Sequence, residues 1–372
     1  MSRLPLLVAF SLIVSACSET PSAPLATSLP VEAHATVSAG SITAVMTGLN
    51  SPRGLNWGPE GALYVTEAGT TQTTGACIQF LEGATLQSKC YSGTGSVSRL
   101  WKGEQTRIAT GLPSTYVVQS QFASGPQDIS FLGRGRAMVA IGWGGGPTQR
   151  GDLGQAALDA GTLAQLEPNG SWRVVADISA FEQAANPAGG IIDSNPYGVL
   201  TEGGRTFVVD AGGNSLLEVG ANGRISLVAV FPPTAAPAPF NQSEAVPTRV
   251  RRGPDGALYV STLTGAPFVA GSAKIYRVQP GQSPTVYLDG FKTITDFAFA
   301  PDGGVYVLQF ATAPVFFGGP GALIHVSASG TRTTVTTNLF QPTGVVVGPD
   351  GSVYVSNLGT SVGNGEVLRI TP

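Results

Sequence analysis

Gly253-Pro254-Asp255-Gly256-Ala257-Leu258-Tyr259-Val260 is the clearest copy of a motif that recurs along this 372-residue chain. Further copies are GPEGALYV at 58–65, PDGGVYVL at 301–308 and GPDGSVYV at 348–355, with weaker ones within 125–142 and 195–214. Asp and Gly accept the left-handed backbone that a tight hairpin turn needs. The apolar run after each turn is typical of a strand that is covered on both faces. The motif therefore predicts a repeated hairpin whose second strand is buried between neighbouring sheets.

Each repeat contains four short strand-like segments, and radial stacking of four-stranded sheets leaves only short, protected edges. If Pro52, Pro126, Pro196, Pro247, Ile294 and Pro342 start the repeats, the spacings are 74, 70, 51, 47 and 48 residues. We therefore predict an all-β, six-bladed β-propeller of the NHL or TolB-like kind over residues 41–372, with seven blades as the alternative. The last repeat has only three strands, so we expect the lone segment 41–46 to supply its outer strand and close the ring.

The composition agrees with many strands and tight turns. The chain has 50 Gly, and only 12% of its residues are charged, with 20 Lys+Arg against 23 Asp+Glu. A helical bundle needs more charged and helix-forming residues, and a disordered chain would lack the 42% hydrophobic content. A net charge of −3 also argues against nucleic acid as a partner. We expect a monomer.

The N-terminus resembles an export signal. Arg3 precedes an apolar run from Leu4 to Val14, which is too short to span a bilayer, and Val14-Ser15-Ala16-Cys17 resembles a bacterial lipobox. We therefore predict a lipoprotein signal peptide over 1–16 with lipidation of Cys17, and an ordinary signal peptide as the alternative. Residues 17–40 are rich in Ser, Ala, Thr and Pro, which predicts a flexible tether. We therefore expect an exported protein that only its lipid holds at the cell envelope, either at the outer membrane or at the cell surface. The alternative is an extracellular protein.

Two further cysteines, Cys77 and Cys90, lie 13 residues apart in one Gly-rich segment. In an exported protein, a disulfide that closes this loop is the simplest interpretation. A metal site built on the two thiolates would need further ligands, and the chain has only two His.

The long connections are all expected on one face of the ring, which we call the long-loop face. They are 67–95, 111–125, 143–161, 178–195, 231–246, 262–272 and 310–321, whereas the turns on the opposite face are short. Long insertions on one face of a repeat protein usually mark its binding face. Aromatic residues in these loops suit a planar apolar small molecule or a protein partner, although they could instead seal the loops onto the ring. The candidate ligand-binding residues are Arg53, Trp143, Tyr197, Arg249 and Phe268.

Oxygen ligands near the channel mouth suggest a second possibility. Glu67, Asp210 and Asn357 close equivalent strands of different repeats and could hold Ca²⁺ or another divalent cation. Asp128 or Asp296 would then act as a base in a cation-dependent hydrolase or lyase of the gluconolactonase-like type. The alternative is a structural ring of charges, in which Arg53 and Arg249 pair with Glu67 and Asp296. No other cofactor is expected.

Familiar catalytic arrangements that depend on histidine are not apparent. His34 lies in the expected tether and His325 lies within an apolar strand, so Ser-His-Asp and Cys-His catalysis lack a proton carrier.

The repeats and the sequences between them resemble the ScyD/ScyE family of exported propellers related to NHL-repeat proteins. The matching motifs are GPEGALYVTEAG at 58–69, the Cys77 and Cys90 pair, SNPYG at 194–198 and VVDAGGN at 208–214, and the likeness spans about 45–370. It implies a six-bladed propeller, and propellers of this kind commonly serve as binding platforms. The sequence therefore favours a binding module over an enzyme.

Overall fold

A computed structural model describes residues 35–36, 40–82, 85–133, 136–313 and 318–371. The predicted signal peptide, Cys17 and most of the predicted tether lie outside the described residues. The described part of the chain belongs to one compact unit, residues 34–372. No helix in the described ranges is long and apolar enough to cross a membrane.

Six sheets, each with four antiparallel strands, follow one another through the described residues, and we interpret each as a blade; one of them gains a fifth, parallel strand, described below. From first to last strand they are β3 (Pro52–Trp57), β4 (Leu63–Glu67), β7 (Gly95–Trp101) and β8 (Glu104–Leu112); β11 (Pro126–Phe131), β12 (Ala137–Ile141), β13 (Thr162–Leu166) and β14 (Trp172–Asp177); β15 (Pro196–Glu202), β16 (Arg205–Asp210), β17 (Ser215–Val219) and β18 (Ile225–Val230); β21 (Pro247–Arg252), β22 (Leu258–Thr262), β23 (Ala273–Val278) and β24 (Thr285–Phe291); β25 (Ile294–Phe299), β26 (Val305–Gln309), β27 (Gly321–Val326) and β28 (Arg332–Leu339); and β29 (Gly344–Val347), β30 (Val353–Asn357), β31 (Gly365–Thr371) and β2 (Ser41–Leu49).

The first strands of these sheets contact one another in a closed cycle, β3 to β11, β15, β21, β25, β29 and back to β3. The N-terminal strand β2 pairs antiparallel with β31, from Ser41 opposite Thr371 to Leu49 opposite Gly365. The predicted closure of the ring by the N-terminal strand is therefore confirmed.

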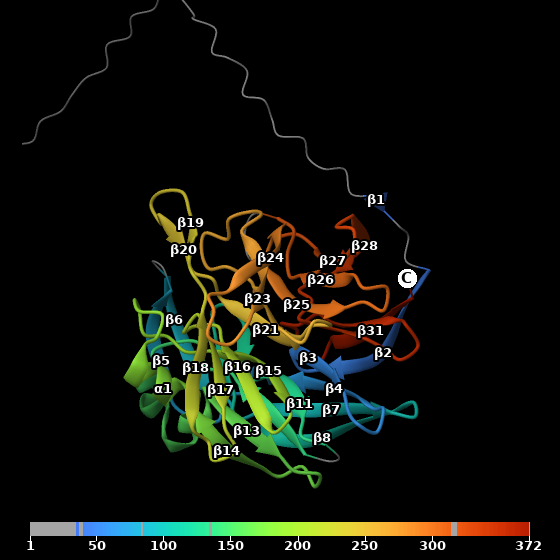
Figure 1. The fold of residues 1–372 in the computed structure, drawn as a ribbon. Coiled ribbons are helices and arrows are strands. Elements are labelled where there is room, and N and C mark those ends of the chain that lie inside the picture. Colours follow the sequence, from blue (N-terminus) through green and yellow to red (C-terminus); the bar gives the residue numbers. More distant parts are fainter. Residues whose placement is uncertain (1–34, 37–39, 83–84, 134–135, 314–317, 372) are drawn as a thin grey trace, which may run out of the picture. The chain divides into compact units, whose positions relative to one another are not determined.

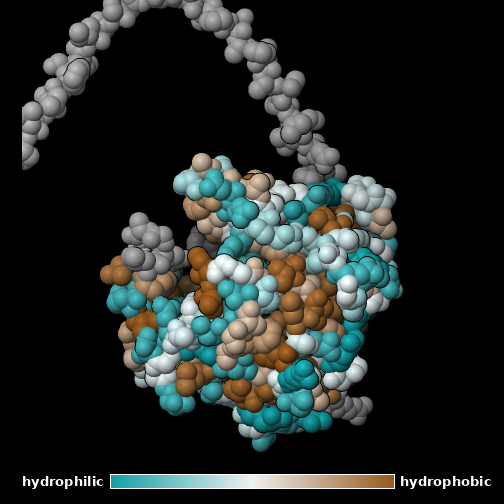
Figure 2. Space-filling view, turned by 60° about the vertical axis from the view of Figure 1, so that its left-hand side comes forward, coloured by the Kyte–Doolittle hydropathy of each residue, from teal (hydrophilic) through white to brown (hydrophobic). Residues whose placement is uncertain are grey.

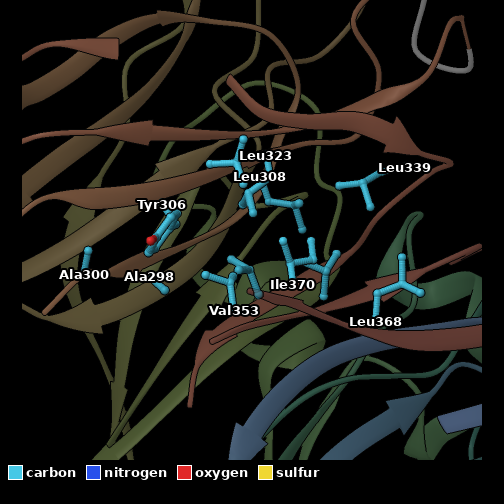
Figure 3. Close-up of a cluster of buried hydrophobic side chains, with 12 residues drawn as sticks. Ala298, Ala300, Tyr306, Leu308, Leu323, Leu339, Val353, Leu368 and Ile370 are labelled. Carbon is cyan, nitrogen blue, oxygen red and sulfur yellow. The ribbon is translucent and has the colours of Figure 1, made fainter. Parts of the chain in front are cut away.

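The hydrophobic core lies between neighbouring blades, as strands that are covered on both faces require. One cluster joins the β25 and β29 blades, where Leu308 and Leu323 lie close to Val353 and Ile370 (Figure 3). All four side chains are buried. Each such interface buries apolar area on two sheets at once, which makes the stability of one blade depend on its neighbours.

The innermost strands carry a bulge near their start in five of the blades. The pairing register shifts after the first residue of β3, β11, β15, β21 and β25. An extra residue in a bulge is unpaired and redirects the side chains around it. As a result, the second residues of β3, β15, β21 and β25, and the third residues of β11, β21 and β25, contribute side chains to two successive layers described below.

An additional sheet covers part of the long-loop face, where the sequence predicted only loops. It contains β5 (Cys77–Glu82), β6 (Thr85–Tyr91), β9 (Thr115–Val117) and β10 (Phe122–Ser124), in the order β10-β9-β6-β5. We call it the accessory sheet. Cys77 lies directly opposite Cys90 across β5 and β6, and the two form a disulfide, which confirms that prediction.

Three of the other long loops, 143–161, 178–195 and 231–246, also hold regular structure. They contain the 3₁₀ helices η1 (Pro147–Leu153) and η2 (Gln155–Asp159), the helix α1 (Ile178–Ala185) and the hairpin strands β19 (Thr234–Ala235) and β20 (Gln242–Ser243). Figure 1 shows β5, β6 and α1 grouped on one side, with the β19–β20 hairpin projecting above them. The long-loop face is thus built from folded insertions.

The predicted tether is not wholly irregular. Its residues Ala35–Thr36 form β1, which pairs parallel with Thr333 and Thr334 on the outer strand β28. An outer strand presents unpaired N–H and C=O groups, so a chain segment that runs beside it can add to the sheet.

Candidate functional site

A cavity of about 130 Å³ lies where the first strands begin. The second residue of the first strand lines it in four blades, as Arg53, Tyr197, Thr248 and Thr295, and Thr343, just ahead of β29, lines it in a fifth. The three Thr hydroxyls each donate to a carbonyl of the next blade, Thr248 to Ile294 (2.9 Å), Thr295 to Pro342 (3.0 Å) and Thr343 to Pro52 (2.8 Å). These bonds join neighbouring blades and leave Arg53 and Tyr197 as the large polar groups of this central cavity.

The Arg53 guanidinium is buried and has no ion pair among the described residues. It donates to the carbonyl oxygens of Ala123 (2.7 Å), Pro52 (3.4 Å) and Gly359. Its carbon lies 4.9 Å from the centre of the Phe122 ring, and its Nε has no hydrogen-bond partner in the described structure. Burial lowers the pKa of Arg53, with a smaller opposing effect from Tyr197.

A second layer of charge lies at the third residues of the first strands. The Arg249 guanidinium forms an ion pair with Asp128, and its Nε lies 3.4 Å from Asp296 Oδ1. Arg251 Nη2 reaches the same carboxylate at 3.1 Å. Burial raises the pKa of Asp128 to about 6 although Arg249 opposes this. Asp128 and Asp296, the predicted bases, therefore lie in a buried ion network that links three blades.

The structural ring of charges, in which Arg53 and Arg249 pair with Glu67 and Asp296, is present only in part. Arg249 pairs with Asp296, as that alternative predicts. Arg53 instead hydrogen-bonds carbonyl groups, and Glu67 pairs with Arg107 at 2.6 Å.

The three predicted metal ligands each hold a backbone N–H at the start of their own blade. Glu67 accepts from Asn50 (2.7 Å), Asp210 from Asn195 (2.6 Å) and Asn357 from Phe340 (2.7 Å). Burial raises the pKa of Asp210 to about 6. No cluster of three or more His, Cys, Asp or Glu suited to a metal ion is found among the described residues. The role that the geometry gives these side chains is to fix the loop ahead of the first strand.

A larger cavity, of about 430 Å³, lies between the accessory sheet and the blades. Phe80 of β5, Phe122 of β10 and Phe268 of the loop after β22 line it, and all three are half-buried. We call it the aromatic cavity. It shares Phe122 and Asn195 with the lining of the central cavity. In Figure 2, hydrophobic patches alternate with hydrophilic ones over the surface.

Lys89 of β6 is a buried cation in the wall of the aromatic cavity. Its Nζ lies 4.4 Å from the Trp143 ring centre and 5.1 Å from that of Phe80, and it donates to the Gly144 carbonyl. Trp143 itself is fully buried, and its Nε1 donates to Gly146 (3.2 Å). The aromatic cavity thus has a rigid, hydrogen-bonded wall on this side.

Four of the five predicted ligand-binding residues line these two adjacent cavities. Arg53 and Tyr197 line the central cavity, and Trp143 and Phe268 line the aromatic cavity. The fifth, Arg249, lines neither of them and belongs to the buried ion network.

Phe80 and Lys89 were not predicted from the sequence. Their signal was the alternating segment Cys77-Ile78-Gln79-Phe80, which has the two-residue period of a strand. The cysteine pair indicated a loop instead, and a loop prediction gives no reason to place these side chains in a wall.

The chain matches no protein-family model and no curated protein. Among solved structures it is similar to a protein assigned as an oxidoreductase (glucose dehydrogenase) from Thermus thermophilus, with 16% identity over 89% of this chain and 99% of the other, and a TM-score of 0.54. It is also similar to regucalcin, a calcium-binding protein from Agrobacterium tumefaciens, with 12% identity, 91% and 97% covered and a TM-score of 0.53. A luciferin-regenerating enzyme follows, with 13% identity, 89% and 95% covered and a TM-score of 0.51.

The chain has a β-propeller fold. The predicted all-β propeller class is confirmed by the sheet topology together with these likenesses. At such low identity they show the fold alone, and the activities in their names belong to those proteins.

Proposed function

We propose that this protein is a binding module that takes a small planar apolar molecule into the aromatic cavity on its long-loop face. The observation that carries the proposal is a cavity of about 430 Å³ lined by the half-buried rings of Phe80, Phe122 and Phe268. Small-molecule sites are typically clefts of about 300–1,000 Å³ with aromatic linings and few polar groups. A protein partner, the other prediction for this face, stays a prediction.

A planar ligand suits these walls because aromatic rings stack in offset or edge-to-face arrangements. Six of the twelve residues that line the cavity are polar or charged, and hydrogen bonds hold two of them in place. Asn195 Oδ1 accepts from the Trp143 N–H (3.1 Å), and Lys89 donates to a carbonyl. A cavity whose walls are held in this way loses little entropy when a ligand enters.

The second predicted function, a cation-dependent hydrolase or lyase, has support only at the level of the fold. Its predicted ligands and bases are already engaged by backbone N–H groups and arginine side chains. Metal analysis of the purified protein tests it: stoichiometric Ca²⁺ that is lost with Asp210→Ala would favour this enzyme.

The cellular setting and the family belong to the same proposal. The lipobox supports an exported protein that is anchored through Cys17, and the motifs at 58–69, 194–198 and 208–214 support membership of the ScyD/ScyE family. A lipid anchor would hold the module at the cell envelope.

Calorimetric titration with 2-naphthamide, a neutral planar probe, tests the proposed function. We expect a Kd of roughly 100 μM or tighter. Phe80→Ala and Phe268→Ala should each weaken binding about tenfold through lost ring contacts. Phe240→Ala is the matched control, because Phe240 is exposed and lines none of the cavities described above. No binding by the wild type, or equal weakening in the control, would overturn the proposal.

A further inference from the structure

We infer that the central cavity is a carboxylate site, so that the ligand of this module is a planar aromatic acid whose ring occupies the aromatic cavity. This inference rests on the proposed function and names the chemistry of its ligand. It starts from Arg53, a buried side chain without an acidic partner among the described residues.

The guanidinium of Arg53 retains hydrogen-bonding capacity. It has five N–H donors, and its three hydrogen bonds go to the carbonyl oxygens of Pro52, Gly359 and Ala123. Carbonyl groups carry no net charge, so the buried positive charge is not neutralised. The Nε–H group has no partner in the described structure, although a buried donor without one is costly. An anion in the cavity would neutralise this charge.

The neighbouring acids serve other partners. Asp128 and Asp296, one layer away in the channel, pair with Arg249. Glu67 pairs with Arg107, and Asp210 accepts from Ser194 (2.8 Å) and from backbone N–H groups. Arg53 is thus distinguished from the other channel cations, Arg249 and Arg251, which both contact carboxylates.

The cavity beside Arg53 fits a carboxylate in size and polarity. At about 130 Å³ it has room for a carboxylate group. Tyr197 lines it together with the threonines and offers a phenolic hydroxyl. Hydrogen bonds between a guanidinium and a carboxylate are among the stronger ones in proteins.

The adjacency of the two cavities defines the shape of the ligand. Phe122 and Asn195 belong to both linings, so the two cavities lie side by side at these residues. Phe122 also contacts the Arg53 guanidinium through its ring face. A ring in the aromatic cavity with a carboxylate directed towards Arg53 uses both cavities at once.

Comparative titration of 2-naphthoate and its neutral isostere 2-naphthamide tests the inference. We expect the acid to bind the wild type about tenfold more tightly than the amide. Arg53→Gln should bring the ratio of the two affinities close to one, and Tyr197→Phe should lower it about threefold. Tyr197→Phe keeps the ring and its packing, so it serves if the Arg53 variant does not fold. Arg205→Gln, on a remote exposed arginine, should leave the ratio unchanged.

The possible failures differ from one another. Equal binding of acid and amide by the wild type overturns the carboxylate site and leaves the proposed function intact. A tenfold preference that both Arg53→Gln and Tyr197→Phe retain also overturns it. If neither probe binds, the proposed function fails and the carboxylate site fails with it.

Discussion

Gly54 lies where two innermost strands approach closely. A Cβ atom added there would meet the Gln127 carbonyl oxygen at 2.8 Å and Asp128 Cα at 2.9 Å. Both are backbone atoms that cannot rotate away. We predict that Gly54→Ala lowers the free energy of unfolding by about 3 kcal/mol, as overpacking does.

Gly151→Ala is the matched control, because the added Cβ meets nothing within 4 Å and the residue needs no left-handed backbone. It should leave stability nearly unchanged. Chemical denaturation compares the two variants, and equal stability would contradict the packing of β3 against β11.

Glu182 is a buried acid of α1 with an unusual titration. Burial raises its pKa to about 7, with further contributions from Asp210 and Asp193. Because this lies above the reference value of 4.5, the folded state holds a proton that the unfolded chain releases. The group therefore stabilises the fold at low pH, and this stabilisation is lost as pH rises from about 4.5 to 7.

Glu182→Gln should remove this dependence. We predict that the free energy of unfolding of the variant is ~2 kcal/mol higher than that of the wild type at pH 8. This difference should shrink at pH 5. Denaturation series at both pH values measure it. A variant that is less stable than the wild type at pH 8 would contradict the assignment.

The sequence predicts which side chains lie at the site better than it predicts which groups they contact. Arg53 and Arg249 were grouped because both lie near the start of a first strand. In the structure, Arg53 is the second residue of the bulged strand β3, and Arg249 is the third residue of the bulged strand β21. Arg53 therefore lines the central cavity, whereas Arg249 belongs to the ion network. A bulge depends on pairing with the next strand, and the repeat pattern alone does not reveal it.

The accessory sheet joins two insertions that are distant in sequence. Residues 67–95 supply β5 and β6, residues 111–125 supply β9 and β10, and Cys90 pairs with Tyr116 across them. The blade hairpins were predictable because their Pro-Asp-Gly turns are local signals. The pairing of β6 with β9 was not predictable, because no local turn connects these strands.

The disulfide should stabilise this sheet in particular. We predict that the double variant Cys77→Ser, Cys90→Ser loses about 3 kcal/mol of local stability in the accessory sheet. Hydrogen exchange should then speed up at β5 and β6 and stay unchanged at β26, in the opposite part of the ring. Uniform loss of protection in both regions would contradict a local role.

Across the whole molecule, closure of the ring depends on β2. Met46 and Leu49 of this strand are buried, and its hydrogen bonds to β31 connect the two ends of the propeller. A chain that begins at residue 50 should therefore melt about 10 °C or more below one that begins at residue 40. Equal melting temperatures would show that the ring closes without β2.

The accessory sheet, the loops that carry Trp143 and Phe268, and the starts of the first strands together form the two cavities. A crystal structure of the protein with 2-naphthoate would show directly whether they form one ligand site. We predict the ring between Phe80, Phe122 and Phe268, with the carboxylate on Arg53. A ring bound elsewhere, or a crystal whose two cavities hold no ligand at saturating 2-naphthoate, would contradict it.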